Sequence, residues 1–160
     1  MFTCGVILLE SKKHYTYEQI HQLTIKAGEN ILNEHIDYDY IVGVLRGGLV
    51  PATILSHYTG IPLDIIKWST RDFTQNVVNH EIAKLLNEGV NIVLVDDIND
   101  SGRTFFEIKQ SLNYNSDTKG KLTTISVLER HNTQYKSDYC GEIVSSDDWI
   151  CFPWEPEIDE

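Results

Sequence analysis

The sequence is poor in cysteine and in positive charge. Its 3 cysteines (Cys4, Cys140 and Cys151) are odd in number and widely spaced, which fits neither a disulfide framework nor a zinc site. We therefore expect reduced thiols in a cytoplasmic protein. Lys and Arg number 13 against 24 Asp and Glu, for a formal net charge of −11. This balance argues against nucleic acid as a partner, because such binding needs basic side chains that neutralise phosphates.

Long apolar runs are also missing. No stretch approaches the roughly 20 apolar residues that span a bilayer, and the first residues lack the basic start of a secretory leader. We therefore expect no membrane partner. The hydrophobic fraction of 41% and the charged fraction of 23% are ordinary for a globular protein. A chain of this length predicts one domain, residues 1–160.

The order of the apolar segments predicts the fold class. Thr16 and Gln19 form a capping-box pattern before a helical period, and most of the expected strands are apolar throughout. Such strands, alternating with helices, are typical of a parallel sheet covered on both faces, so we expect an α/β fold with a central, mostly parallel sheet. The expected strands are 3–9, 40–45, 61–68, 91–95, 122–128 and 139–144, and the expected helices are 17–33, 49–58, 80–88 and 104–112.

The most informative stretch is residues 93–104, Val-Leu-Val-Asp-Asp-Ile-Asn-Asp-Ser-Gly-Arg-Thr. A buried strand here runs into a loop at its carboxyl end, which is where open α/β folds bind ligands. Asp96 and Asp97 would be costly to leave ionised and unpartnered, and Mg²⁺, which binds one or two carboxylates plus ligand oxygens and waters, removes that cost. Asp100 lies further along and is a candidate general base, or an acceptor for an N–H group of a substrate.

The end of the same stretch predicts an anion site. Ser101, Gly102, Arg103 and Thr104 supply backbone amides and hydroxyls at the start of a helix, where unpaired donors hold phosphates. The simpler alternative is that Asp100 or Ser101 only caps that helix. Capping alone does not account for three acids and a glycine together, so we favour the phosphate site.

A second stretch, Leu45-Arg46-Gly47-Gly48-Leu49-Val50-Pro51, has the same plan. Glycines let the backbone approach an anion closely, and Arg46 offers a planar charged fork for phosphate oxygens. Alone, this segment is equally compatible with an ordinary strand–turn–helix and a solvent-facing Arg46. Together with residues 93–104, it suggests a ligand with separated phosphates.

These two stretches resemble the phosphoribosyl-pyrophosphate motif and the pyrophosphate loop of type I phosphoribosyltransferases. The layout of residues 15–62 and 92–155 is most similar to the purine branch, especially the xanthine-guanine enzymes. The resemblance implies the type I phosphoribosyltransferase fold with a small C-terminal hood, mainly residues 145–156. It also implies Mg²⁺-dependent transfer of a phosphoribosyl group from phosphoribosyl pyrophosphate to a purine (xanthine, guanine or hypoxanthine), in purine salvage, by a homodimer or homotetramer.

The resemblance further implies a role for each matching residue. Arg46, a catalytic candidate, and Gly47 would bind pyrophosphate, across a peptide that is often cis in the family. Asp96 and Asp97 would hold the ribose hydroxyls and Mg²⁺, and residues 101–104 the 5′-phosphate. Asp100 would face N7 of the purine as the acid/base. Trp149 would stack on the base and the Ile150 backbone would read its exocyclic position, although a hydrophobic plug at the sheet end is the alternative for this segment.

Some positions depart from the family pattern. Ser101 replaces a commoner Thr and Arg103 a commoner Gly, while Arg130 stands where the family reads the purine 6-oxo group with Lys. Residues 68–79 match the mobile catalytic loop, whose Ser69, Thr70 and Arg71 could close over pyrophosphate or lie in a plain surface loop. Two other functions stay open: transfer to a different nitrogenous base, and a non-catalytic nucleotide-binding regulator with the same fold.

Overall fold

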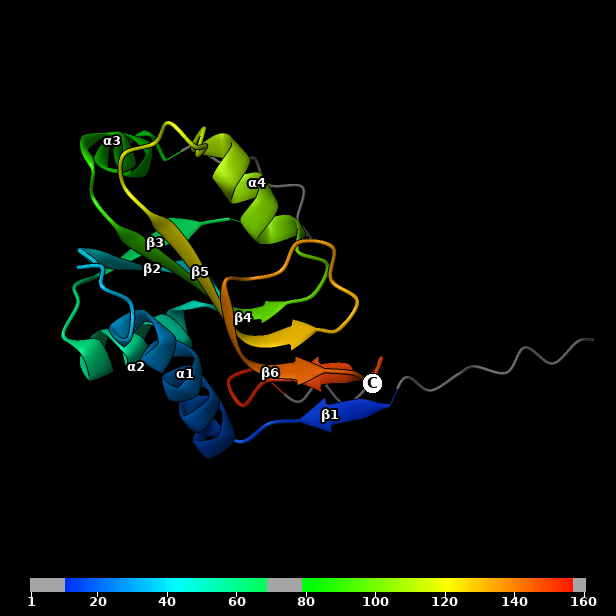
Figure 1. The fold of residues 1–160 in the computed structure, drawn as a ribbon. Helices are drawn as coiled ribbons and strands as arrows, with labels where there is room; N and C mark the ends of the chain where they lie inside the picture. The colour runs from blue at the N-terminus through cyan, green and yellow to red at the C-terminus, as the bar shows by residue number, and fades with distance from the viewer. Residues whose placement is uncertain (1–10, 69–78, 157–160) are drawn as a thin grey trace, which may run out of the picture.

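The structure is a computed structural model, and it describes residues 11–68 and 79–156. The strand expected at 3–9 and residues 69–78 of the expected loop lie outside this part of the chain. The described chain is built on a parallel sheet with two helices on each face (Figure 1). The α/β architecture predicted from the sequence is therefore confirmed.

The central sheet has five strands in the order β3-β2-β4-β5-β6, and every neighbouring pair is parallel. After β3 the chain crosses to the other side of β2 to form β4, so the strand order reverses between β2 and β4. In open α/β sheets, such a switch point is where ligands bind. The strands are β2 (Tyr40–Leu45), β3 (Leu63–Lys67), β4 (Ile92–Asn99), β5 (Leu122–Arg130) and β6 (Tyr139–Val144).

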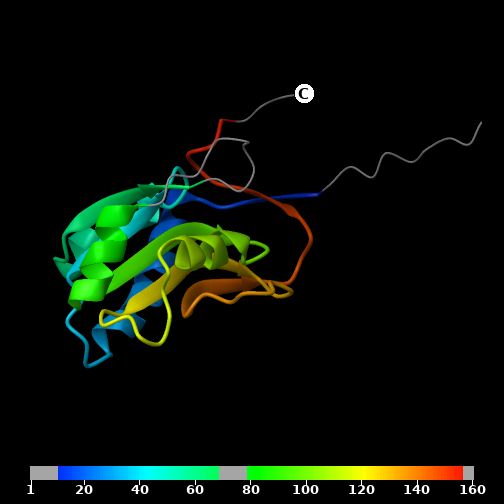
Figure 2. The same cartoon turned by 90° about the horizontal axis from the view of Figure 1, so that it is seen from above.

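Four helices cover the sheet in two pairs. Their bounds are α1 (Tyr17–Leu32), α2 (Leu49–Thr59), α3 (His80–Glu88) and α4 (Arg103–Ser111). The capping box at Thr16 and Gln19 is present, with each side chain accepting from the other residue's backbone amide. Helices α1 and α2 lie on one face and α3 and α4 on the other (Figures 1 and 2). None of the helices in the described ranges combines the length and apolarity needed to cross a membrane.

Each face of the sheet has its own apolar core. Ile31 of α1 and Leu55 of α2 pack against Val93 of β4 on one face. Leu86 of α3 and Ile108 of α4 pack on the other face, in a cluster that includes β2, β3 and β5 side chains. Burial on both sides explains why the strands read as continuous apolar runs. The two cores together pack against both faces of the strands.

Strand β4 is longer than predicted. The sequence suggested 91–95 because the apolar run stops at Val95, but the strand continues to Asn99. Its pairing with β2 ends at Gly43 and Val95, whereas its pairing with β5 continues to Asn99 and Glu129. Beyond Val95, β4 is therefore paired on one side only. The unpaired side of this extension is bordered by the loop after β2.

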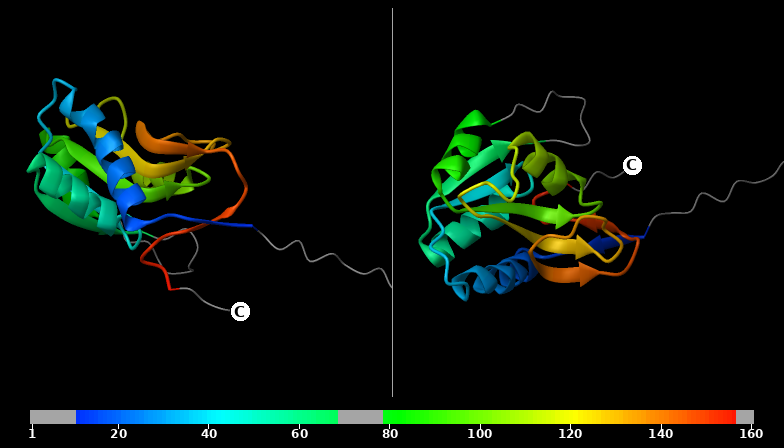
Figure 3. Two further views of the ribbon diagram at one scale, coloured as in Figure 1. Left: turned by 90° about the horizontal axis from the view of Figure 1, so that it is seen from below. Right: turned by 45° about the horizontal axis from the view of Figure 1, so that its top comes forward.

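A second, two-stranded sheet forms the hood. Strand β1 (Lys12–His14) pairs in parallel with β7 (Trp149–Cys151), so segments near the two ends of the described chain lie side by side (Figure 3). Neither strand was predicted, because three residues are too few to show a period. Ile150 and Phe152 pack with Tyr15 and with Val144 of β6 in a third apolar cluster. The hood, expected mainly from residues 145–156, thus also includes β1.

Candidate active site

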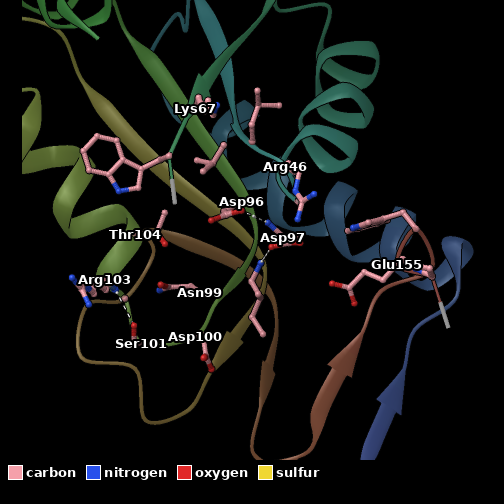
Figure 4. Close-up of a pocket in the computed structure, with 18 residues that line it drawn as sticks. Arg46, Lys67, Asp96, Asp97, Asn99, Asp100, Ser101, Arg103, Thr104 and Glu155 are labelled. Atoms are coloured by element: carbon pink, nitrogen blue, oxygen red, sulfur yellow. Dashed lines mark hydrogen bonds between the residues drawn. The ribbon is translucent and has the colours of Figure 1, made fainter. Parts of the chain in front are cut away.

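A cleft of about 960 Å³ lies at the carboxyl edge of the sheet, at the switch point between β2 and β4 (Figure 4). It brings together the ends of β2, β3 and β4, the start of α4 and the segment after β7. Its described lining consists of residues 44–47, 67–68, 96–104 and 154–156. Both stretches singled out in the sequence therefore face one cavity.

The carboxylates of Asp96 and Asp97 stand at the floor of this cleft. Successive strand residues point to opposite faces, yet both carboxylates border the cavity, because it lies along the open edge of β4. Oδ1 of Asp97 accepts from the amide of Ile98 at 2.7 Å, and Oδ1 of Asp96 accepts from the amide of Asp97 at 2.9 Å. The two acids are thus held by the backbone beside Arg46, which comes from the neighbouring strand (Figure 4).

The loop after β2 approaches Asp97 closely. It begins at Arg46, whose peptide bond to Leu45 is cis, and continues through Gly47 and Gly48 into α2. A Cβ on Gly48 would lie 2.3 Å from the carbonyl oxygen of Val95. Only a glycine lets this loop pack so tightly against β4. The close packing places the Arg46 and Gly47 backbone at the edge of the cleft.

Residues 101–104 turn from β4 into α4. Gly102 has φ +86°, a left-handed conformation that favours glycine, and it is the residue before the helix. The N-cap residue of α4 is Gly102, which has no side chain to cap the helix, while Oγ of Ser101 accepts a long hydrogen bond from the amide of Arg103 at 3.3 Å. Ser101 thus makes one contact of the kind that the capping alternative predicts, whereas Asp100 pairs with Arg130. The start of α4 borders the cleft, where the backbone amides at a helix start can meet an anion.

A segment that sequence reasoning did not assign supports this turn from behind. The amide of Gln134 donates to the carbonyl of Ser101 at 3.3 Å, and the ring of Tyr135 stacks on Phe106 of α4 with centroids 4.2 Å apart. A Cβ on Gly102 would lie 2.6 Å from backbone atoms of Tyr135. The connection between β5 and β6 thus sets the shape of the turn.

Asn99 and Glu129 form a buried polar pair that sequence reasoning also missed. Each is 3% exposed, and Asn99 borders the cleft. Nδ2 of Asn99 donates to Oε2 of Glu129 at 3.0 Å and to the carbonyl of Tyr135 at 2.8 Å. The same Oε2 accepts from the amide and the hydroxyl of Ser137, both at 2.7 Å. Glu129 therefore ties β4 to the supporting segment through a carboxylate whose burial is compensated by donors.

Asp100 lies at the mouth of the cleft and is bound to Arg130. Nε of Arg130 donates to Oδ1 of Asp100 at 3.1 Å, and the side chain of Asp100 is 55% exposed. A carboxylate so exposed can reach a base that enters the cleft. Arg130 itself is not part of the described lining.

Apart from Arg130, the predicted residues divide into two groups in the structure. Those around the cleft are Arg46, Gly47, Asp96, Asp97, Asp100, Ser101, Gly102, Arg103 and Thr104. Trp149 and Ile150 lie in the hood, outside the described lining: Trp149 is 48% exposed, whereas Ile150 is buried in the apolar cluster of the hood. The assignment of Trp149 and Ile150 to the base stays a prediction.

The cleft also contains residues that the sequence did not single out. Lys67 ends β3 and Trp68 follows it, while Trp154 and Glu155 lie after β7. Lys67 could have been found from its place at the end of a predicted strand, since the ends of parallel strands share one edge. Trp154 stacks on Phe152 with centroids 4.8 Å apart, a contact with no sequence signal. Lys67 and Arg46 are both cations of the cleft lining (Figure 4).

The donor set suits a divalent cation that is shared with a ligand. Within residues 11–68 and 79–156, no three His, Cys, Asp or Glu side chains are grouped to hold a metal by themselves. Mg²⁺, however, commonly uses one or two carboxylates together with substrate phosphates and waters. Asp96 and Asp97, together in the lining of one cleft, fit that requirement.

Comparison with known proteins identifies the class. The family model for the phosphoribosyl transferase domain matches residues 16–160, and the chain belongs to this family. Among curated relatives, it is 28% identical over 147 residues to the xanthine-guanine phosphoribosyltransferase of Idiomarina loihiensis, covering 89% of this chain and 86% of that protein. It is 29% identical over 150 residues to the enzyme of the same name from Cereibacter sphaeroides, with 89% and 86% covered.

Solved structures agree on the fold. The purine phosphoribosyltransferase of Pyrococcus horikoshii superimposes with a TM-score of 0.68 at 24% identity, covering 94% of this chain and 99% of that chain. At that identity, the likeness establishes the fold alone. The fold and family implied by residues 93–104 and 45–51 are confirmed.

Proposed function

We propose that this protein transfers the 5-phosphoribosyl group of phosphoribosyl pyrophosphate to a 6-oxopurine in purine salvage. Xanthine, guanine and hypoxanthine are the candidate bases, and the products are the nucleoside monophosphate and pyrophosphate. The observation that carries the proposal is the cleft itself. Its lining includes an acid pair and two turns whose amides and charge suit anions, at the ends of the neighbouring strands β2 and β4. The names of the curated relatives support the choice of a purine.

The two turns match the two charged ends of the donor. The amides and hydroxyls of residues 101–104 suit the 5′-phosphate, because the start of α4 supplies unpaired donors at the positive end of a helix dipole. Arg46 and the Gly47 amide suit the pyrophosphate at the other end of the cleft. Asp96 and Asp97 lie between them, where the ribose hydroxyls would be. The ligand is thus held along the carboxyl edge of the sheet.

In the reaction, the bond between C1′ and the pyrophosphate oxygen breaks, and a bond from C1′ to a purine nitrogen forms. Pyrophosphate leaves with the bonding electrons, and Arg46 stabilises the charge that develops on it. The attacking purine nitrogen donates its lone pair, and the purine loses the proton of its other imidazole nitrogen, N7, to Asp100 at the mouth of the cleft. Holding both reactants in line supplies much of the acceleration.

Magnesium is a further part of the proposal. Asp96 and Asp97 would hold Mg²⁺ together with oxygens of the donor. When bound, the ion neutralises charge on the leaving pyrophosphate. Loss of turnover in EDTA, with recovery on adding Mg²⁺, tests this part.

Self-association and cellular location complete the proposal. We propose a homodimer or homotetramer, supported by the partly exposed apolar side chains of Leu63 and Ile65 on the edge strand β3. We also propose a cytoplasmic location, supported by the free thiols of Cys140 and Cys151. Sedimentation of the purified chain tests the oligomeric state.

The deciding experiment offers the purified chain phosphoribosyl pyrophosphate, Mg²⁺ and a panel of bases. Nucleotide formation and pyrophosphate release are measured together for xanthine, guanine, hypoxanthine, uracil and nicotinamide. Turnover with a 6-oxopurine supports the proposal. Turnover only with uracil or nicotinamide assigns a different base, and donor binding without turnover of any base indicates a regulator.

A further inference from the structure

The guanidinium of Arg130, at the end of β5, connects three separate segments. Nε donates to Oδ1 of Asp100 at 3.1 Å. Nη2 donates to the carbonyl of Asp148 at 2.7 Å, and Nη1 donates to the carbonyl of Ser146. Each of its three nitrogens therefore has a different acceptor. Asp100 belongs to the loop after β4, and the two carbonyls belong to the segment between β6 and the hood strand β7.

Burial distinguishes this arrangement from an ordinary surface ion pair. The side chain of Arg130 is 13% exposed, so its charge has left most of the surrounding water. A guanidinium in that position needs acceptors on several sides, and a planar fork with fixed donor directions meets this need better than an ammonium. An exposed pair such as Lys84 with Glu88 on α3, by contrast, contributes little to the fold.

The contacts continue from Arg130 into the hood. Ser11, just before β1, donates its hydroxyl to the carboxylate of Asp148, and the carbonyl of Ser11 accepts from the amide of Trp149 at 2.8 Å. A chain of contacts thus runs from Asp100 through Arg130 and Asp148 to Trp149. Its first member is the proposed proton acceptor, and its last is the residue predicted to stack on the base.

We propose that Arg130 is a positioning residue that fixes Asp100 and residues 145–149 of the hood relative to each other. It thereby sets the site in which the base lies, and it does so without contacting the base. The inference rests on the proposed function for its meaning in catalysis. The hydrogen bonds of Arg130 to Asp100, Ser146 and Asp148 are a property of the free protein, so they can be tested separately from catalysis.

The first test is amide hydrogen exchange on the full chain without ligands. R130Q removes the charge and the fork, and we expect exchange across residues 145–151 to rise about tenfold or more, as the loss of charge-assisted hydrogen bonds predicts. Exchange in β2 and β4 should not change. D100N keeps both carbonyl contacts of Arg130 and should leave exchange in residues 145–151 at the wild-type rate. K84Q serves as the matched control for loss of one positive charge.

The second test is steady-state kinetics of the same variants. R130Q should raise KM for the purine about tenfold and lower kcat, while KM for phosphoribosyl pyrophosphate changes less than about threefold. R130K should fall between R130Q and the wild type. A purely structural defect would not separate the two KM values.

Several results would overturn the positioning role of Arg130. One is that amide exchange across residues 145–151 in R130Q stays at the wild-type rate. If KM for the purine rises while this exchange is unchanged, Arg130 contacts the base directly and does not position the hood. If R130Q does not fold, R130K is used, and wild-type exchange of the hood in R130K overturns the proposal. If the wild type converts no base, the proposed function fails, while the exchange comparison still decides whether Arg130 holds the hood.

Discussion

The carboxylate of Asp97 fills the space that any side chain at position 47 would need. A Cβ on Gly47 would lie 1.9 Å from Oδ2 of Asp97 and 2.4 Å from its Cγ. The turn after β2 and the acid pair on β4 are therefore fitted to each other without clearance. A change at either residue moves the other.

The first prediction concerns this fit. Gly47→Ala forces Asp97 to turn away or the loop to withdraw, so KM for phosphoribosyl pyrophosphate should rise about tenfold or more. Steady-state kinetics with saturating purine measures the change. Gly28→Ala is the control, because its Cβ would meet Cδ2 of Leu55 at 2.2 Å between α1 and α2. It should lower the melting temperature and leave KM unaffected; equal effects on KM would contradict the prediction.

The second prediction concerns the proton acceptor. Asp100→Asn should lower kcat by about a hundredfold or more, which is the usual contribution of general acid–base catalysis. Binding of phosphoribosyl pyrophosphate, measured by calorimetry, should change far less. Equal losses in turnover and donor affinity would remove the acid/base role from Asp100.

The third prediction tests the placement of the base. Trp149→Ala should mainly raise KM for the purine, by about tenfold, because stacking of a base on an aromatic ring contributes on the order of 1–3 kcal/mol. The melting temperature should change little, since Trp149 is half exposed. Trp149→Phe should retain most of the affinity. An unchanged KM in Trp149→Ala would favour Trp154, which borders the cleft, as the stacking residue.

The fourth prediction concerns the buried carboxylate behind the cleft. Glu129→Gln can keep an oxygen at the position of Oε2, which accepts from Asn99 and Ser137, but it removes the negative charge that strengthens these hydrogen bonds. We expect a loss of about 1–3 kcal/mol in the free energy of unfolding, measured by urea denaturation. KM for phosphoribosyl pyrophosphate should also rise, because Asn99 and the turn proposed to bind the 5′-phosphate share this support. Unchanged stability would show that Glu129 does not hold the segment.

The fifth prediction is a pH dependence of stability. Burial raises the pKa of Glu34, but hydrogen bonds from Tyr139, Tyr38 and Lys121 together lower this pKa by more than burial raises it. The net pKa of Glu34 is therefore below the ordinary 4.5. The folded state therefore binds this proton less readily than the unfolded state. The resulting stabilisation is present above about pH 4.5 and is lost as the pH falls through the folded pKa.

Glu34→Gln removes this dependence. The variant should be about 1–3 kcal/mol less stable at pH 7, and its free energy of unfolding should fall less steeply than that of the wild type between about pH 5 and pH 3. Denaturation curves at several pH values measure both slopes. Parallel slopes would show that the Glu34 cluster does not contribute to the acid sensitivity.

The sequence predicts much of the sheet and the floor of the cleft. β2, α3 and β6 have the bounds that their apolar patterns and glycine stops indicate. Residues 46–47 and 96–104 meet because the carboxyl ends of parallel strands lie at one edge of the sheet. The alternation of strands and helices in the sequence is enough to predict this. The prediction ended β4 too early because a rule based on apolar residues assigns acidic residues to a loop, even when they continue a strand.

The support around the cleft could not be predicted in the same way. Arg130 meets Asp100, and Glu129 meets Asn99, only because β4 and β5 are paired in one particular register. Tyr135 reaches the turn before α4 through a connection without helix or strand. Contacts of this kind depend on three-dimensional packing, and the local sequence around each partner carries no sign of the other.

The pairing of β1 with β7 has a consequence for how the molecule is assembled. In the chain, residues 12–14 and 149–151 are separated by the whole central sheet, so their contact closes a very long loop. Closing such a loop costs conformational entropy, and contacts of this kind therefore form late in folding. During synthesis from the amino end, the turns at residues 46–47 and 101–104 can form before β7 exists. A growing chain can therefore form the edge of the sheet that we propose binds phosphate before the hood is in place.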